Sequence, residues 1–154
     1  MRVHVGTDHA GFETKGLLVE WLEKTGHDVI DHGAYELDPD DDYPTPCISA
    51  AEAAAADGDA LGIVLGGSGN GEQMAANRVD GVRAALVWNR ETAMLARAHN
   101  NANVIAVGAR QHTPEEIISF VATFLAEPFS ADPRHQRRID AISAYEQSRS
   151  QSQR

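Results

Sequence analysis

The sequence predicts an α/β fold, a Rossmann-like doubly wound sheet of five parallel strands followed by a C-terminal helix. Short β-rich segments alternate with longer helical patterns, as in βαβ units. The continuous apolar run at residues 61–65 is typical of a buried central strand. A length of 154 residues suits a single domain. We expect this domain at residues 1–147 and a flexible tail at 148–154, which contains no apolar residue.

In the first half of the chain, the helical pattern is clearest where Leu18 and Leu22 recur on one side, and Gly26 marks its end. Residues 33–46 are too acidic and too rich in proline for a helix or a strand. The alanine-rich segment that follows is expected to be helical. The elements expected here are a strand at 2–6, a helix around 17–22, a short strand at 29–30, a helix at 48–56 and the strand at 61–65.

In the second half, Thr113 is the expected N-cap of a helix, with Pro114 at the first helical position and Glu116 completing a capping box. The last helix is polar apart from a stripe that begins at Ile139. We therefore expect residues 129–147 to contribute to a dimer. The elements expected here are a helix at 72–78, a strand at 83–87, a helix at 91–98, a strand at 104–107, a helix from 114 and a helix at 132–147.

Charge and composition restrict the partners of the protein. The 13 Lys and Arg residues oppose 23 Asp and Glu, giving a net charge of −10, so nucleic acid and anionic membranes are poor partners. The charge is uneven, because residues 1–128 hold 8 basic against 20 acidic side chains, or −12, and residues 129–154 hold 5 against 3, or +2. A single Cys47, no signal-peptide pattern and no membrane-spanning run predict a cytoplasmic protein.

The richest motif is the glycine-rich segment at residues 66–71, between the buried strand and a helix. Binding sites of parallel sheets lie beyond the carboxyl ends of the strands, where this segment is expected. Its backbone N–H groups could converge on an oxyanion or a phosphate, although a tight strand-to-helix turn is the alternative. It lacks the dinucleotide-binding and P-loop patterns. The candidate binding residues are Gly67, Ser68, Gly69, Asn70 and Gly71.

Glu72 lies in the first turn of the helix that follows, with Asn70 as the expected N-cap and Gln73 as its capping partner. Two interpretations of Glu72 remain open. Its charge could simply stabilise the start of the helix. Its carboxylate could instead act as a general base on a carbon acid whose developing oxyanion is held by the glycine-rich segment.

Two further groups offer acid–base chemistry near neutral pH. Asp8 and His9 lie at the exit of the first strand, and His99 and Asn100 lie at the end of a helix. Each histidine could equally be a turn or helix-end residue. The acidic run at 38–42 lacks the spaced ligands of a calcium loop and is expected to be a solvated loop. The other histidines show no metal-ligand spacing, so we predict neither a metal nor another cofactor.

The basic cluster of the chain is at residues 134–138. On a helix, Arg134 and Arg138 lie on one face at positions i and i+4, and two guanidinium groups so placed suit bidentate phosphate binding. A solvated, mildly basic helix is the alternative.

Together these motifs resemble those of the ribose-5-phosphate isomerase B family, which includes galactose-6-phosphate isomerase subunits. The resemblance covers nearly the whole chain, and the order and spacing of the motifs make it specific. The matching motifs are residues 6–12, 42–44, 66–71, 75–78, 99–104 and 134–138.

The resemblance implies a metal-free aldose–ketose isomerase that interconverts ribose 5-phosphate and ribulose 5-phosphate through a cis-enediolate. Asp8 and His9 would contact the sugar, with Asp8 and His99 assisting ring opening. The backbone of residues 67–71 would hold the enediolate oxygen, and Asn100 would contact a sugar hydroxyl.

The same resemblance implies that Arg110, Arg134 and Arg138 bind the phosphate of the sugar. In that family the last two arrive from the partner subunit. We therefore expect a homodimer with shared sites, and a tetramer stays open.

Many members of that family place a cysteine base directly before the glycine-rich segment, where this chain has Gly66. The chain is similar to the branch with a glutamate at the position of Glu72, which favours Glu72 as the base that moves a proton between C2 and C1. Two alternatives remain open. One is the same chemistry on a phosphorylated tetrose, allose or galactose, and the other is a noncatalytic phosphosugar-binding module, which would need neither Glu72 nor His99.

Overall fold

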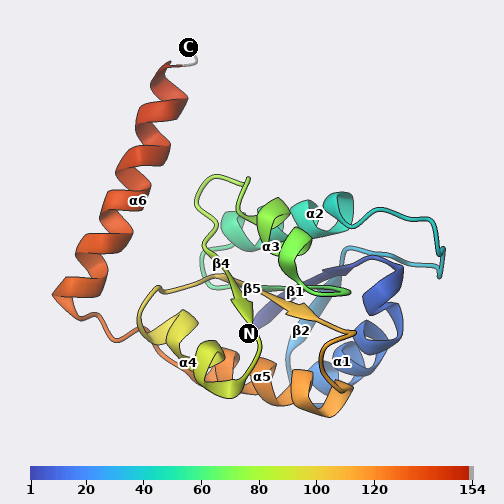
Figure 1. The fold of residues 1–154 in the computed structure, drawn as a ribbon. Coiled ribbons are helices and arrows are strands. Elements are labelled where there is room, and N and C mark those ends of the chain that lie inside the picture. Colours follow the sequence, from blue (N-terminus) through green and yellow to red (C-terminus); the bar gives the residue numbers. More distant parts are fainter. Residues whose placement is uncertain (153–154) are drawn as a thin grey trace.

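The computed structural model describes residues 1–152 and contains a five-stranded parallel sheet in the order β2-β1-β3-β5-β4 (Figure 1). This confirms the predicted doubly wound α/β class. The strands are β1 (Arg2–Thr7), β2 (Asp28–Asp31), β3 (Leu61–Gly66), β4 (Ala84–Val87) and β5 (Val104–Gly108). The helices are η1 (His9–Gly11), α1 (Phe12–Lys24), α2 (Pro44–Ala56), α3 (Asn70–Ala76), α4 (Arg90–Ala98), α5 (Pro114–Ala126) and α6 (Pro133–Ser152).

Helices cover both faces of the sheet, with α2 and α3 on one face and α1, α4 and α5 on the other (Figure 1). The central strands β3 and β5 are buried along their whole length. Alternate side chains of β3 point to opposite faces, so that Ile63 joins the large apolar cluster around Phe124 while Val64 joins an alanine-rich cluster under α2. The small alanines let α2 pack closely on the sheet, on the side where the site is built.

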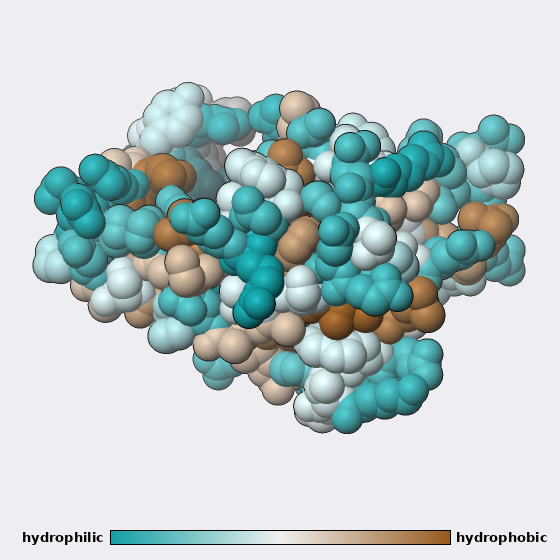
Figure 2. All heavy atoms as spheres, turned by 60° about the horizontal axis from the view of Figure 1, so that its bottom comes forward, coloured by the Kyte–Doolittle hydropathy of each residue, from teal (hydrophilic) through white to brown (hydrophobic). Residues whose placement is uncertain are grey.

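Helix α6 projects away from the sheet (Figure 1). Among its described residues, His135 and Ile139 alone are buried, whereas Ile142 is 49 % and Tyr145 65 % exposed. On the face formed by α1, α4 and α5, apolar side chains occur in scattered groups between hydrophilic ones (Figure 2). Within the described part of the chain, no helix combines the length and the apolar character needed to cross a membrane.

The expected starts of helices α2 and α3 are wrong, and each has a local cause. Helix α2 begins at Pro44. Proline is tolerated at this position because the N–H group that it lacks would have no partner in the first turn of a helix. Helix α3 takes Gly69, in the left-handed region at φ +85°, as its N-cap, so Asn70 is the first helical residue. Gln73 accordingly donates to the carbonyl of Ala84 at 3.2 Å and does not form the expected capping pair.

At the C-terminal end, α6 continues to Ser152, beyond its expected end at residue 147, so residues 148–152 of the expected tail are helical. Residues 153–154 lie outside the described part. The capping box at the start of α5 is confirmed, because Thr113 Oγ1 accepts from the Glu116 N–H and the Glu116 carboxylate accepts from the Thr113 N–H.

Candidate active site

Three loops meet at the carboxyl edge of the sheet, after β1, β3 and β5. Thr7 Oγ1 donates to the carbonyl of Leu65 at 2.9 Å, and the Arg110 N–H donates to the carbonyl of Gly67 at 3.1 Å. The chain order reverses between β1 and β3, since β2 lies on the other side of β1. Sites of open parallel sheets form at such a switch point. The glycine-rich segment therefore lies where the sequence places a binding loop.

The Glu72 side chain is 4 % exposed and turns back over the end of β3. Its carboxylate occupies the space in which a side chain at position 66 would begin, because a Cβ atom built on Gly66 would overlap the Glu72 carboxylate atoms. Only glycine at position 66 is compatible with this position of the Glu72 side chain. The positive φ of Gly69 produces the turn that brings Glu72 there.

The first turn of a helix favours the ionised form of an acidic side chain, but the other surroundings of Glu72 favour its protonated form. Burial raises the pKa of Glu72 above its usual value, and the negative charge of Asp8 adds to this. The backbone N–H groups of Glu72 itself and of Gly69 lower the pKa, and they do not outweigh the burial. A carboxylate with a raised pKa is a stronger proton acceptor, so the environment strengthens Glu72 as a base.

Asp8 and His9 follow β1 and face the same edge. Asp8 is 7 % exposed and caps η1 by accepting the Ala10 N–H at 2.9 Å. The loop before α2 brings Asp41 to His9, where Asp41 Oδ1 lies 2.7 Å from His9 Nδ1 and accepts the His9 N–H at 2.8 Å. The hydrogen bond that Asp41 accepts from the His9 ring raises the pKa of His9, opposing a smaller lowering by burial.

One group of three metal-ligating side chains, Asp8, His9 and Asp41, is close enough to share a metal ion. It is the one such group among the described residues. Their donor atoms lie within 4.8 Å of one another. His9 Nδ1 already has Asp41 as a partner, so the group is satisfied without an ion. A metal-free site stays a prediction.

Two side chains of α2 and the turn before it also face the glycine-rich segment. The Tyr43 ring covers Gly71 so closely that a Cβ atom there would overlap it. Cys47 is fully buried, and burial, followed by the charges of Glu72 and Asp8, raises the pKa of its thiol. Cys47 therefore lies near the carboxylates although it is distant in sequence, and it stays a protonated thiol rather than a nucleophile.

A second group of candidate residues lies at the opposite, amino edge of the sheet. His99 follows α4 and stacks on His135 of α6, with ring centroids 4.1 Å apart and planes inclined by 19°. The carbonyl of Asn100 accepts from Arg83 Nε at 2.9 Å, directly before β4 begins. Since strands of four to six residues rise about 3.3 Å per residue, roughly 13 to 20 Å separate the two edges.

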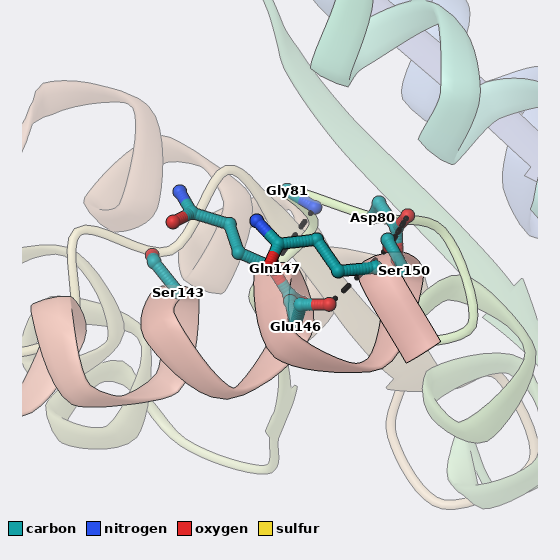
Figure 3. A pocket seen from close by; sticks show the side chains of 7 residues that line it. Asp80, Gly81, Ser143, Glu146, Gln147 and Ser150 are labelled. Carbon is teal, nitrogen blue, oxygen red and sulfur yellow. Dashed lines mark hydrogen bonds between the residues drawn. The ribbon is translucent and has the colours of Figure 1, made fainter. Parts of the chain in front are cut away.

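Arg134 and Arg138 lie exposed at the start of α6, near this second group. The far half of α6 is held to the turn before β4 by long hydrogen bonds, from the Gly81 N–H to Glu146 at 3.3 Å and from Ser150 to Asp80 at 3.5 Å (Figure 3). A hollow of about 480 Å³ remains between the helix and this turn. Arg134 and Arg138 lie at the other end of the helix, on the turns where His135 and Ile139 are buried.

Within one chain, the structure brings together Asp8, His9, the glycine-rich segment, Glu72 and Arg110, and it leaves His99, Asn100, Arg134 and Arg138 at the other edge. The sequence interpretation missed Asp41 and treated its acidic run as a solvated loop. The topology carries the missing signal. A loop that leaves a strand parallel and adjacent to β1 emerges at the same edge as His9.

Comparisons with known proteins show the family and the fold of this chain. Residues 3–142 match the family model described as Ribose/Galactose Isomerase. A ribose-5-phosphate isomerase B of Mycolicibacterium paratuberculosis is 58 % identical over 95 % of this chain and 92 % of the relative. A galactose-6-phosphate isomerase subunit LacB of Clostridium acetobutylicum is 37 % identical over 92 % and 82 %. The crystal structure of ribose-5-phosphate isomerase B from Mycoplasma genitalium with bound ribulose-5-phosphate has a TM-score of 0.91 and 41 % identity over 95 % and 96 %.

Proposed function

The chain belongs to the ribose/galactose isomerase family, and on this premise we propose that it interconverts ribose 5-phosphate and ribulose 5-phosphate through a cis-enediolate. The observation that carries the proposal is the buried Glu72 carboxylate beside the glycine-rich segment. Abstraction of a proton next to a carbonyl needs a base and preorganised donors for the developing oxyanion. Glu72 supplies the base, and the backbone of residues 67–71 supplies the donors.

The proposed roles follow the placement of the side chains. Glu72 moves the proton between C2 and C1 of the sugar, and Asp8 and His9 bind the sugar beside it. Arg110, which follows β5 at the same edge, contributes to phosphate binding. The base at position 72 replaces a cysteine at position 66, because the Glu72 carboxylate fills the place of that side chain.

The remaining roles require a second subunit. His99 and Asn100 lie across the sheet from Glu72 in the same chain, so a His99 that assists ring opening with Asp8 must come from a partner chain. Arg134 and Arg138 are carried on the projecting α6 and would bind the phosphate in the partner's site. We therefore place all four residues in the neighbouring site of a homodimer, and leave a tetramer open.

Substitution of Glu72 by Gln tests the base. The Glu72→Gln variant should lose roughly 100-fold or more in kcat for ribose 5-phosphate and should stop exchanging the C2 proton of the sugar with deuterated solvent. A loss of only a few-fold would contradict the assignment. A substrate-binding module without activity would show no exchange in the unaltered protein either.

Subunit mixing tests the shared site. An Arg134→Ala dimer and a Glu72→Gln dimer, exchanged at equal amounts, should recover about a quarter of full activity, because half of the dimers are mixed and each has one intact site. His99→Asn should complement Glu72→Gln in the same way, and should fail to complement Arg134→Ala. The reverse pattern would place His99 in the same site as the Glu72 of its own chain.

A second candidate is the same reaction on a phosphorylated tetrose or hexose. The observation in its favour is the 37 % identity to a galactose-6-phosphate isomerase subunit. The 58 % identity to a ribose-5-phosphate isomerase B favours the five-carbon sugar over it. A comparison of kcat/KM for four-, five- and six-carbon sugar phosphates decides between the substrates, and the five-carbon sugar is expected to be the fastest.

A further inference from the structure

Asp41 makes two hydrogen bonds to one residue of the site. Its Oδ1 atom accepts the backbone N–H of His9 at 2.8 Å and lies 2.7 Å from the Nδ1 atom of the His9 ring. The side chains are 20 % and 26 % exposed, so both are partly shielded from water. Because an ionised carboxylate only accepts hydrogen bonds, the geometry requires the proton on Nδ1 of His9.

The two bonds have different consequences. A bond to the backbone N–H would anchor the acidic loop whatever side chain stood at position 9. The bond to Nδ1 constrains the ring itself, fixes its tautomer and leaves Nε2 as the ring nitrogen that a ligand can meet. Asp41 thus constrains the imidazole ring of His9, whose Nε2 atom can contact a ligand, as well as the His9 backbone.

We propose that Asp41 is a positioning residue of the active site, which holds the His9 ring through Nδ1 and directs Nε2 at an oxygen of the sugar phosphate. This inference rests on the proposed isomerase function. It assigns a role to the acidic run before α2, because the loop that carries Asp41 closes over the end of β1 at the same edge as Glu72.

The groups around His9 favour the protonated ring more than water does. The hydrogen bond that Asp41 accepts is the largest influence and raises the pKa of His9, and the charges of Asp8 and Asp41 raise it further. Burial and the guanidinium of Arg110 lower the pKa of His9, with a smaller combined effect. These are the charged groups that face His9 from β1, the acidic loop and the segment after β5.

Two substitutions separate orientation from charge. The amide oxygen of Asp41→Asn can still accept both hydrogen bonds but carries no charge, whereas Asp41→Ala loses both. For Asp41→Asn we expect a lower pKa of His9 by ¹⁵N NMR in the ligand-free protein, and an alkaline limb of kcat/KM shifted to lower pH by the same amount. For Asp41→Ala we expect a loss of about tenfold or more in kcat/KM at every pH, with Glu72-dependent C2 proton exchange still detectable.

Asp40→Asn, in the same loop, is the matched control and should leave the His9 pKa and the pH profile unchanged. The proposal is overturned if Asp41→Asn changes neither the His9 titration nor the pH profile. It is also overturned if Asp41→Ala and Asp41→Asn lose activity equally, in proportion to a lower Tm, since Asp41 would then only anchor the loop. The NMR titration needs no substrate, so its outcome is independent of the Glu72→Gln test of the proposed function.

Discussion

The contact between Gly66 and Glu72 makes a single methyl group a sharp probe of the site. In Gly66→Ala, the new Cβ atom would overlap the Glu72 carboxylate, which must then leave its buried position. Gly66 lies at the end of β3 with no positive φ, so an alanine backbone is unstrained there. The substitution therefore acts on the Glu72 side chain and not on the main chain.

The expected magnitude follows from the role of Glu72. A displaced general base costs about 100-fold or more in kcat, the range attributed to such catalysis. Both changes remove the same carboxylate from the site. The kcat of the double variant Gly66→Ala, Glu72→Gln should therefore lie within about threefold of the kcat of Glu72→Gln alone. The assay is steady-state conversion of ribose 5-phosphate, with a crystal structure of the variant to locate the displaced side chain.

Gly62→Ala on the same buried strand is the matched control. Its Cβ atom would meet Val104 at 3.0 Å and the Cβ atom of Ala54 at 3.3 Å, contacts that are relieved by a shift of a few tenths of an ångström and do not touch Glu72. It should keep most of the activity at a modest cost in stability. If Gly66→Ala retained activity within fivefold of the unaltered protein, the carboxylate would not be needed in its observed position and the reasoning would fail.

Three further predictions concern protonation and metals. His4 and His32 are hydrogen-bonded at 2.9 Å, and burial lowers the pKa of both from 6.5. The stability that this pair contributes is therefore full above pH 6.5 and is lost as the pH falls below it. Urea unfolding should give a lower free energy of unfolding at pH 5.5 than at pH 7.5, and the difference should be smaller in His32→Asn. Burial raises the pKa of Glu72 above 4.5, so the ionisation of Glu72 destabilises the fold as the pH rises above 4.5. Calorimetry at pH 7.5 should therefore give Glu72→Gln a higher Tm than the unaltered protein. Treatment with EDTA should leave kcat unchanged, and an activity restored only by added metal would instead assign an ion to the cluster around Asp41.

The fold could be predicted from sequence because its signals are local. The apolar run of β3 and the capping box of α5 each depend on neighbouring residues, and both appear where expected. The helix boundaries at Pro44 and Gly69 were missed because they depend on which residue takes an unusual backbone position, not on hydrophobic pattern. The end of α6 was missed because its apolar stripe stops at Tyr145, and no apolar residue marks the turns that follow.

The site was only partly predictable, because its decisive contacts join distant segments. Nothing in the sequence states that the Glu72 carboxylate fills the side-chain position of residue 66, since that depends on the turn at Gly69. The contact between Asp41 and His9 spans 32 residues and becomes visible only when β2 and β1 pair. The division of residues between two edges follows from strand direction.

The charges of the carboxyl edge explain why a second subunit would be needed to bind a phosphorylated sugar. One chain offers there the carboxylates of Asp8, Asp41 and Glu72 against the guanidinium of Arg110 and the ring of His9, so one chain gives an anion no excess of positive charge. In the proposed dimer, the arginines of α6 would reverse this balance only where two chains meet. Substrate affinity is then coupled to dimer formation, so dilution below the dissociation constant of the dimer should raise KM for ribose 5-phosphate. Since the same dilution removes His99 from the site, kcat per chain should fall with it, which distinguishes a shared site from a dimer that serves stability alone.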